Sequence, residues 1–229
     1  MELPKKLYYY ALKGALSSSF CLLEMADARV DFHFCKSMPE WHQLRDEVPG
    51  RFPTGQLPAM ELVDGTIVPE SGAIKRTVAA ALGKLGSGKD YSMSEALAGV
   101  SDDLKKLVNS CAPNVMNLGL MGSDKVTWSE EDTRKCVEEV RPKVVQSLTK
   151  IANMLSESKD RFTSTGDTLG EIDFFWTLHF IESGPHPGIL GELQPFYARL
   201  RSNAGITRYI EGTGQYSTPQ IPMWVQPLP

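Results

Sequence analysis

The strand-like segments of this sequence are confined to residues 1–82, and this asymmetry limits the folds that the chain can adopt. Lys6–Tyr10 is rich in β-prone residues, and Val30–Phe34 alternates apolar and polar side chains. Between these two segments, Ala15–Met25 carries apolar residues at helical spacing. The sequence therefore predicts a β-α-β unit at the start of the chain, with two parallel strands and a right-handed crossover.

A hairpin and a helix complete this first domain. Residues 36–54 are polar and contain three prolines, and we expect them to be irregular. Two β-prone runs then flank Asp64-Gly65, a dipeptide suited to the positive φ angles of a tight turn, so residues 57–68 predict a β-hairpin. The segment PESGAIKRTVAAAL follows with a helical pattern and has Ser71 near its start. These elements together predict one small α/β domain.

The later segments with a clear period are all helical. Residues 83–93 contain three glycines and two lysines, and we expect them to form a linker. Helices are predicted at residues 94–111, after a capping box at Thr127–Glu130, from Pro142 to about Ser156, after a second capping box at Thr168–Glu171, and at residues 191–202 and 206–210. The sequence thus predicts an α/β domain over residues 1–82, a linker over 83–93 and an all-helical domain over 94–229.

Composition narrows the functional classes. Apolar residues make up 41% of the chain and charged residues 23%, as in an ordinary globular protein. Because the formal net charge is −4 and the basic residues are scattered, we expect no nucleic-acid partner. No apolar run reaches the roughly 18 residues of a membrane span, and the N-terminus lacks a signal-peptide pattern. We therefore expect no membrane partner and a cytoplasmic location.

The cysteines and histidines do not form a recognisable site. The four cysteines, Cys21, Cys35, Cys111 and Cys136, are far apart in the sequence and form no CxxC pair. This spacing is typical of reduced cytosolic thiols rather than of disulfides or metal ligands. The four histidines are also dispersed. We therefore expect no metal site.

A candidate binding surface lies between Gln56 and Ser71. Pro58 cannot donate to a strand ladder, so it marks the entrance of a strand, and a cis bond there would present the backbone of Leu57 to an extended ligand. Glu70-Ser71 opens a helix, and a helix N-terminus with a free hydroxyl binds carboxylates well. A small peptide that carries a carboxylate would fit both features.

The same residues resemble the glutathione-binding half of the glutathione S-transferases. That family carries Gln-Leu/Val-Pro before its third strand and Glu/Gln-Ser at the start of its third helix, which correspond here to Gln56-Leu57-Pro58 and Glu70-Ser71. KLYYYALKG is similar to the first strand and loop of the tyrosine-type classes, closest to the sigma-like class. Trp41 with Arg45 resembles the pair after their second strand. The segments RPKVVQSLTKIANML and GDTLGEIDFFWTLHFIE resemble the fifth and sixth helices.

The resemblance implies a fold and an activity. The fold is a thioredoxin-like domain followed by an all-α helical bundle, in a homodimer. The activity is attack of the glutathione thiolate on a small, apolar electrophile, as in cytosolic detoxification. Glutathione is then a co-substrate, and no cofactor is implied.

The resemblance also implies the role of each site residue. Leu57, preceding Pro58, would pair its backbone with the cysteinyl part of glutathione. Glu70, Ser71 and Gln56 would hold the γ-glutamyl end. Trp41 and Arg45 would bind the glycyl carboxylate, and Asp102 would reach across the dimer to the glutathione amine.

The residue that activates the thiol is implied to be Tyr9. A tyrosine hydroxyl that donates a hydrogen bond to sulfur favours the thiolate. Since neighbouring strand residues face opposite ways, Tyr8 and Tyr10 share one face and Tyr9 lies on the other, and all three could instead pack in a buried strand. The rival is Ser17, although we expect the three serines 17–19 to lie on an exposed helix surface. Ala15 stands where sigma-like members carry an arginine, and the loop before Gln56 is about four residues longer than usual.

Two questions stay open at the sequence level. The resemblance places the second-substrate pocket among the loop Ala11–Gly14, the helix after the linker, and the tail with Met223 and Trp224. The alternative to an enzyme is a non-catalytic relative with a structural or binding role. A glutaredoxin-like thiol transferase is excluded because ALKG, the first loop, contains no cysteine.

Overall fold

The structure is a computed structural model that describes residues 1–110, 129–184 and 186–216. By their internal contacts, these residues form two compact units. The first unit contains residues 1–85 and 203–216, and the second contains residues 86–110, 129–184 and 186–202. The expectations for Thr127, Met223 and Trp224 lie outside the described residues.

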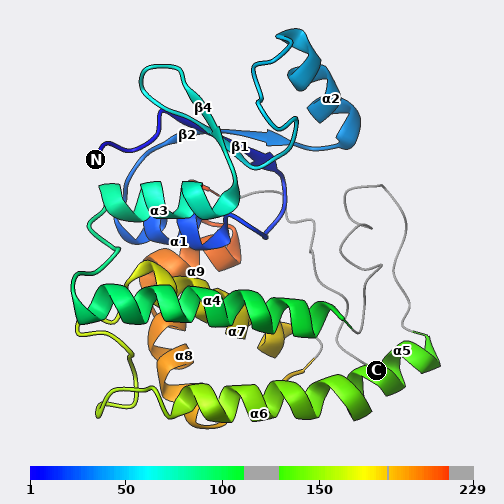
Figure 1. Cartoon of the computed structure of the whole chain (residues 1–229), viewed down its shortest axis with the longest axis vertical. Helices are drawn as coiled ribbons and strands as arrows, with labels where there is room; N and C mark the ends of the chain where they lie inside the picture. Colours follow the sequence, from blue (N-terminus) through cyan, green and yellow to red (C-terminus); the bar gives the residue numbers. More distant parts are fainter. Residues whose placement is uncertain (111–128, 185, 217–229) are drawn as a thin grey trace. The chain divides into compact units, whose positions relative to one another are not determined.

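A four-stranded mixed sheet forms the centre of the first unit (Figure 1). The strands are β1 (Lys6–Tyr10), β2 (Asp31–Cys35), β3 (Ala59–Glu61) and β4 (Ile67–Pro69), in the order β2-β1-β3-β4. β1 pairs parallel with β2 and antiparallel with β3, and β3 pairs antiparallel with β4. The predicted β-α-β opening and the hairpin are thus both confirmed.

Among the described residues, four helices accompany this sheet. They are α1 (Ser17–Met25), α2 (Met38–Glu47), α3 (Ser71–Ala81) and α9 (Ala204–Glu211). α1 packs between α3 and α9, and its residues from Ser17 to Glu24 are all buried. A helix that is covered on all sides needs no polar face. This corrects the expectation that serines 17–19 lie on an exposed surface.

The expectation of an irregular segment at residues 36–54 is wrong over α2. Ser37 caps this helix, since its hydroxyl accepts a hydrogen bond from the Glu40 N–H at 3.3 Å. Pro39 lies in the first helical turn, where a missing N–H costs nothing. The prolines that suggested an irregular segment therefore flank or open a helix instead of preventing one.

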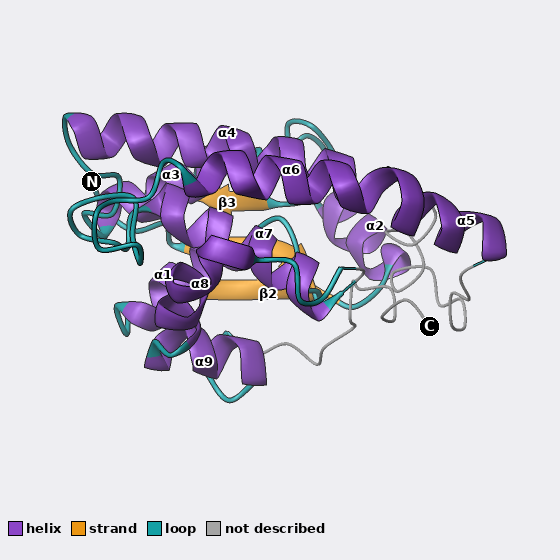
Figure 2. Cartoon of the chain, turned by 90° about the horizontal axis from the view of Figure 1, so that it is seen from below, coloured by secondary structure: helices purple, strands orange, loops and turns teal. Residues whose placement is uncertain are grey.

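The second unit is all-helical. It contains α4 (Lys89–Asn109), α5 (Glu130–Arg134), the π-helical turn η2 (Lys135–Val140), α6 (Arg141–Ala152), α7 (Leu169–Ser183), the 3₁₀ turn η3 (Gly191–Leu193) and α8 (Gln194–Arg201). α5, η2 and α6 follow one another without a break, and α6 runs beside α4 (Figures 1 and 2). α7 packs against α4 and α8, and twelve of its residues are buried, so it is the axis of this unit.

Several helices differ from the sequence expectation in their bounds or in the unit to which they belong. α4 begins at Lys89, inside the predicted linker 83–93 and before the predicted start at Ser94. α5 is capped by Ser129, whose hydroxyl accepts from the Asp132 N–H at 3.0 Å. α9 covers the predicted segment 206–210 but belongs to the first unit, whereas the sequence placed it in the helical domain. The capping box at Thr168–Glu171 is confirmed.

The described part of the chain has neither a membrane-spanning helix nor a cluster of metal ligands. None of its helices is long and apolar enough to cross a membrane. Among the same residues, no group of three or more histidine, cysteine, aspartate or glutamate side chains is arranged to hold a metal ion. The expectation that the protein needs no metal or cofactor stays a prediction.

Candidate functional site

One end of the sheet gathers most of the residues that the sequence singled out. Tyr8 is opposite Ala59 across β1 and β3, and Ala59 is opposite Pro69 across β3 and β4. The residues that follow or precede these partners are Tyr9, Pro58 and Glu70. Because the three strands are paired in this register, all three residues lie at the same edge of the sheet.

The Leu57–Pro58 segment enters this edge with its backbone unoccupied. The peptide bond between the two residues is cis, as the sequence analysis allowed. Across the described residues, neither the N–H nor the C=O of Leu57 has a hydrogen-bond partner. The Leu57 side chain is half-buried against the cluster around Tyr8 and Trp41. The fold thus fixes the side chain and leaves the backbone able to pair with an extended ligand.

The start of α3 offers a second set of unoccupied groups. Glu70 is the N-cap residue and has a φ of 77°, a conformation that costs a residue other than glycine roughly 1–3 kcal/mol. Its carbonyl accepts the Ile74 N–H at 3.1 Å, so α3 is properly closed at its first turn. Within the described chain, the side chains of Gln56, Glu70 and Ser71 make no hydrogen bond or ion pair. These polar groups are available for an amine and a carboxylate.

The hydroxyl of Tyr9 acts as an acceptor inside the protein. Tyr9 is 6% exposed and accepts a hydrogen bond from the Ala15 N–H, in the segment before α1, at 2.7 Å. The hydroxyl hydrogen of Tyr9 is not donated to any described residue. Burial raises the pKa of Tyr9 well above its usual value, and the Ala15 N–H offsets part of that rise. The phenol is therefore neutral at physiological pH and keeps its hydrogen for a ligand.

The two neighbouring tyrosines have committed their hydroxyl hydrogens. Tyr8 donates to the Glu61 carboxylate at 2.6 Å, and Tyr10 donates to the Met38 sulfur at 3.2 Å. Burial, and then the hydrogen bond to Glu61, raise the pKa of Tyr8 to about 12. Both hydroxyls act within the protein, which separates them from the hydroxyl of Tyr9.

The hydroxyl of Ser17, the alternative to Tyr9, also has a partner inside the protein. Ser17 is the first residue of α1, is fully buried, and its hydroxyl lies 3.1 Å from that of Tyr209. Its hydroxyl is therefore part of the packing between α1 and α9.

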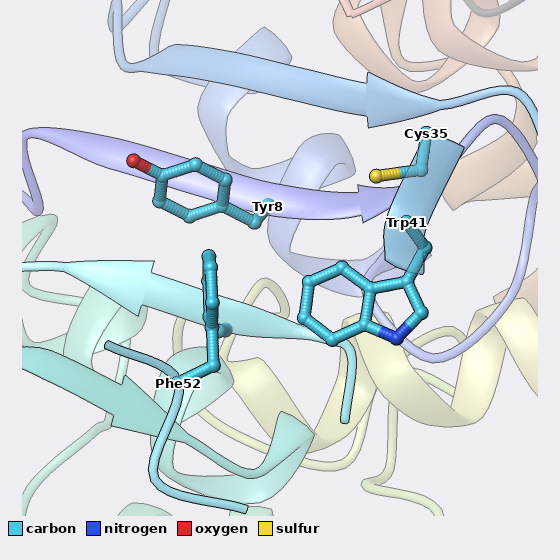
Figure 3. Close-up of a cluster of buried hydrophobic side chains, with 5 residues drawn as sticks. Tyr8, Cys35, Trp41 and Phe52 are labelled. Atoms are coloured by element: carbon cyan, nitrogen blue, oxygen red, sulfur yellow. The ribbon is translucent and has the colours of Figure 1, made fainter. Parts of the chain in front are cut away.

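Trp41 and Arg45 both lie on α2 but differ in their surroundings. Trp41 is 2% exposed and packs edge-to-face on Phe52, with ring centroids 4.9 Å apart (Figure 3). Arg45 lies in the last turn and forms a two-point hydrogen bond with Asp46, at 2.7 and 3.1 Å. Trp41 thus has a packing role, and Arg45 is a surface charge that is already paired.

Asp102 belongs to the second unit. It is exposed on α4 and lies 3.6 Å from the Lys105 ammonium in an ion pair of one helix turn. Its expected role would need a second copy of the chain, so it stays a prediction.

Sequence reasoning missed two contributions to this site. Tyr9 accepts a hydrogen bond from the backbone N–H of Ala15, and a pattern of side chains cannot predict a backbone partner. Arg51 donates to the Tyr8 hydroxyl at 2.7 Å and to Glu61 at 3.1 Å. Tyr8 and Glu61 are two residues apart in register and share a face, so their pairing could have been predicted once the hairpin was placed.

Comparison with known proteins identifies the fold. No family model matches the sequence, and no curated protein matches it. Among solved structures, a glutathione S-transferase from Ascaris lumbricoides matches with a TM-score of 0.72 and 19% identity, over 92% of this chain and 97% of that one. A sigma class transferase from Fasciola hepatica matches with a TM-score of 0.67 and 21% identity, over 92% and 96%. The chain has the glutathione S-transferase fold.

That fold confirms the predicted fold class, a thioredoxin-like N-terminal domain with a helical C-terminal domain. The chain also matches a glutathione S-transferase from the human hookworm parasite Necator americanus that is described as monomeric. The TM-score is 0.68 and the identity 24%, over 92% of this chain and 97% of that one. The glutathione S-transferase fold therefore occurs in a described monomer as well, and it does not settle the assembly of this chain.

Proposed function

We propose that the protein is a glutathione transferase that conjugates the glutathione thiolate to small, apolar electrophiles. The observation that carries the proposal is the Tyr9 hydroxyl, which accepts from Ala15 and keeps its own hydrogen uncommitted among the described residues. It lies at the same sheet edge as the unoccupied Leu57 backbone and the Glu70-Ser71 helix start.

The proposed chemistry needs only this chain and glutathione. A free thiol of this kind has a pKa of about 8.5 and is mostly protonated at neutral pH. The Tyr9 hydroxyl donates to the sulfur and stabilises the anion, while the thiol proton leaves to solvent. Because the Ala15 N–H draws electron density from the same oxygen, it strengthens Tyr9 as a donor. The thiolate then attacks the electrophilic carbon, and the leaving group takes the electron pair of the bond that breaks.

Glutathione would be held by the groups that the fold leaves unoccupied. In the proposal, the Leu57 backbone next to Pro58 pairs with the cysteinyl residue. Ser71, Glu70 and Gln56 bind the γ-glutamyl end, helped by the positive end of α3. The glycyl carboxylate reaches Arg45, which would exchange its partner Asp46, and the ring N–H of Trp41. Asp102 would contribute from a second subunit.

We also propose a cytoplasmic homodimer that acts in detoxification. Support for the dimer comes from the helices of the second unit, where Val137 and Val145 are 42% and 38% exposed. Between α4 and α6 lies an open cavity of about 310 Å³ whose apolar lining includes Val100, Leu104 and Leu107. Light scattering of the purified chain tests this, and a monomer would contradict both the dimer and the role of Asp102.

The activity is tested with Tyr9→Phe. Wild type is expected to be retained on immobilised glutathione and to conjugate a chloronitrobenzene. Losing the donated hydrogen bond should lower kcat/KM at pH 7 by roughly 10- to 100-fold and raise the pKa of the bound thiol by roughly one to two units. Retention on glutathione should be unchanged.

Tyr216→Phe is the matched control, because it also removes a tyrosine hydroxyl from the first unit. That hydroxyl donates to the Ala28 carbonyl and accepts from the Val30 N–H, just before β2, at the sheet end away from Tyr9. We expect it to leave kcat/KM unchanged. If wild type binds glutathione but conjugates nothing, the non-catalytic alternative is favoured. If Tyr9→Phe conjugates normally, Tyr9 is the wrong residue.

A further inference from the structure

We infer that Arg51 is a positioning residue for glutathione binding. It fastens the loop before Leu57 to β1 through Tyr8 and Glu61, and so holds the Leu57 backbone where a ligand can pair with it. This inference rests on the proposed function and extends it to a residue outside the set of groups proposed to bind glutathione.

The attachment is a closed triangle of hydrogen bonds. One guanidinium nitrogen of Arg51 donates to the Tyr8 hydroxyl at 2.7 Å and to a Glu61 carboxylate oxygen at 3.1 Å. The Tyr8 hydroxyl donates to that same oxygen at 2.6 Å. Each donor in the triangle has an acceptor, and the hydroxyl serves as both. Arg51 therefore ties the loop to two strands at once, β1 through Tyr8 and β3 through Glu61.

The charges in the triangle reinforce its geometry. Hydrogen bonds from Tyr8 and Lys5, with the nearby charges of Lys5 and Arg51, lower the pKa of Glu61 to about 2. Glu61 therefore carries its charge throughout the physiological range, and hydrogen bonds to a charged acceptor are the stronger kind. The guanidinium also lies over the rings of Tyr8 and Phe52, at 5.5 and 5.6 Å from their centroids.

Phe52, the next residue of the loop, connects Arg51 to the segment before Leu57. Its ring packs edge-to-face on Tyr8 at 5.3 Å, and Figure 3 shows it beside Tyr8 and Trp41 over one face of the sheet. The Phe52 carbonyl accepts the Gly55 N–H at 3.0 Å, which closes a turn directly before Gln56. The Leu57 side chain then packs on the same cluster.

Leu57 depends on these attachments because its own backbone has none. Its N–H and C=O lack a partner among the described residues, so its position is set from both sides. On one side β3 begins at Ala59, and on the other the Arg51–Phe52 anchor precedes it by five residues. Without the anchor, the segment between Phe52 and Ala59 could adopt other positions. Glutathione binding would then be weakened by the conformational entropy that is lost when this segment becomes ordered.

The test compares Arg51→Met with Lys5→Met in the full chain. Methionine keeps an unbranched stem over the two rings and removes the donors. Lys5 is the matched control, because its ammonium also pairs with Glu61, at 3.0 Å, but its side chain is 59% exposed and Lys5 precedes β1 instead of belonging to the loop. The readouts are the glutathione Kd by calorimetry, and KM for glutathione and kcat for a chloronitrobenzene.

We expect Arg51→Met to raise Kd and KM for glutathione roughly tenfold while kcat at saturating glutathione stays within about twofold of wild type. kcat is preserved because Tyr9 follows Tyr8 on β1 and its side chain therefore points to the other face of the sheet. Lys5→Met should leave all three quantities within about twofold. Arg51→Lys should recover part of the lost affinity, since an ammonium can still donate to Tyr8 or Glu61.

Different failures point to different errors. If wild type does not bind glutathione, the proposed function is wrong and this inference fails with it. If wild type binds glutathione and Arg51→Met binds it equally well, only the inference is wrong. The same holds if Arg51→Met has a lower kcat and a higher KM together with a lower unfolding midpoint. Should Arg51→Met not fold, Tyr8→Phe removes the bridging hydroxyl and keeps the Arg51–Glu61 ion pair. An unchanged KM for glutathione in Tyr8→Phe would also overturn the inference.

Discussion

At the scale of single residues, the decisive difference lies between Tyr8 and Tyr9. They are adjacent and equally aromatic, yet their hydroxyls do opposite things. Tyr8 donates its hydrogen to Glu61, while Tyr9 accepts a hydrogen bond from Ala15 and, among the described residues, donates none. A tyrosine that donates within the protein stabilises the protein. A tyrosine that only accepts within it can donate to a substrate.

The Glu61 carboxylate predicts how the first unit responds to acid. Its pKa is lowered from 4.5 to about 2 in the folded protein, mainly by the hydrogen bonds from Tyr8 and Lys5. A carboxyl with a depressed folded pKa contributes stability above its unfolded pKa and loses it as pH falls toward the folded pKa. Glu61 should therefore stabilise the fold fully above pH 4.5 and progressively less down to about pH 2.

Thermal unfolding followed between pH 6 and pH 2 checks this prediction in wild type and Glu61→Gln. At pH 6 the variant should be the less stable protein, because a glutamine cannot replace the charged acceptor of three donors. The difference should shrink as pH falls below about 4.5. Glu47→Gln, an exposed carboxylate of α2, controls for the loss of one charge. A difference that is constant across the range would contradict the prediction.

At this scale the sequence predicts the strand faces of the tyrosines better than it predicts the surroundings of the side chains. Strand alternation places Tyr9 opposite to Tyr8 and Tyr10, and this is correct. It does not say which face meets α1, and it has no information on the Ala15 N–H. Serines 17–19 were expected at the surface because they are polar, and they are buried because α3 and α9 cover α1 from two sides.

At the scale of elements, α4 and α7 approach each other closely in the second unit. Gly170, in the first turn of α7, donates its N–H to the Ser94 hydroxyl of α4 at 2.9 Å. A Cβ atom on Gly170 would lie 1.8 Å from the Ser94 carbonyl oxygen, which is backbone and cannot move aside. The glycine thus sets how closely the two helices approach.

Gly170→Ala is therefore expected to destabilise the protein by more than about 3 kcal/mol, or to prevent folding. Gly99→Ala is the matched change on α4, where a Cβ would meet no atom within 4 Å. It should be neutral or stabilise the helix by roughly 0.5–1 kcal/mol, because alanine is the better helix former. Urea unfolding of both variants measures this, and equal effects would rule out the packing argument.

Local signals predicted most of the elements and failed where a residue type has two meanings. The capping box at Thr168–Glu171 and the hairpin turn at Asp64-Gly65 are each specific to one structure, and both were located correctly. Pro39 is not specific, since proline breaks a helix interior and also favours a first turn. The prolines of the segment 36–54 therefore predict an irregular segment at the place where α2 forms.

At the scale of the whole chain, the first unit is assembled from two distant parts of the sequence. Glu24 on α1 is 2% exposed and accepts the Tyr216 N–H at 3.0 Å. The Arg208 guanidinium on α9 lies 3.3 Å from the same carboxylate. The sequence placed these last helical residues in the helical domain, because a local pattern shows that a helix forms and not what it packs against.

This arrangement predicts that residues 1–85 cannot fold alone. Without residues 203–216, Phe20 loses the rings of Tyr209 and Tyr216, at 5.9 and 5.3 Å, and Glu24 loses Arg208. Each buried aromatic ring contributes roughly 1.5–3 kcal/mol, and a domain of this size is stable by only about 5–10 kcal/mol.

The fragment 1–85 should therefore show no cooperative thermal transition by circular dichroism. A fusion of 1–85 to 203–216 through about 20 glycine and serine residues, which span roughly 25 Å, should restore one. Ile206 is fully buried, so Ile206→Asp in the fusion should abolish the transition again. Cooperative unfolding of 1–85 alone, with the midpoint of the fusion, would show that the returning segment is not needed for the fold of the first unit.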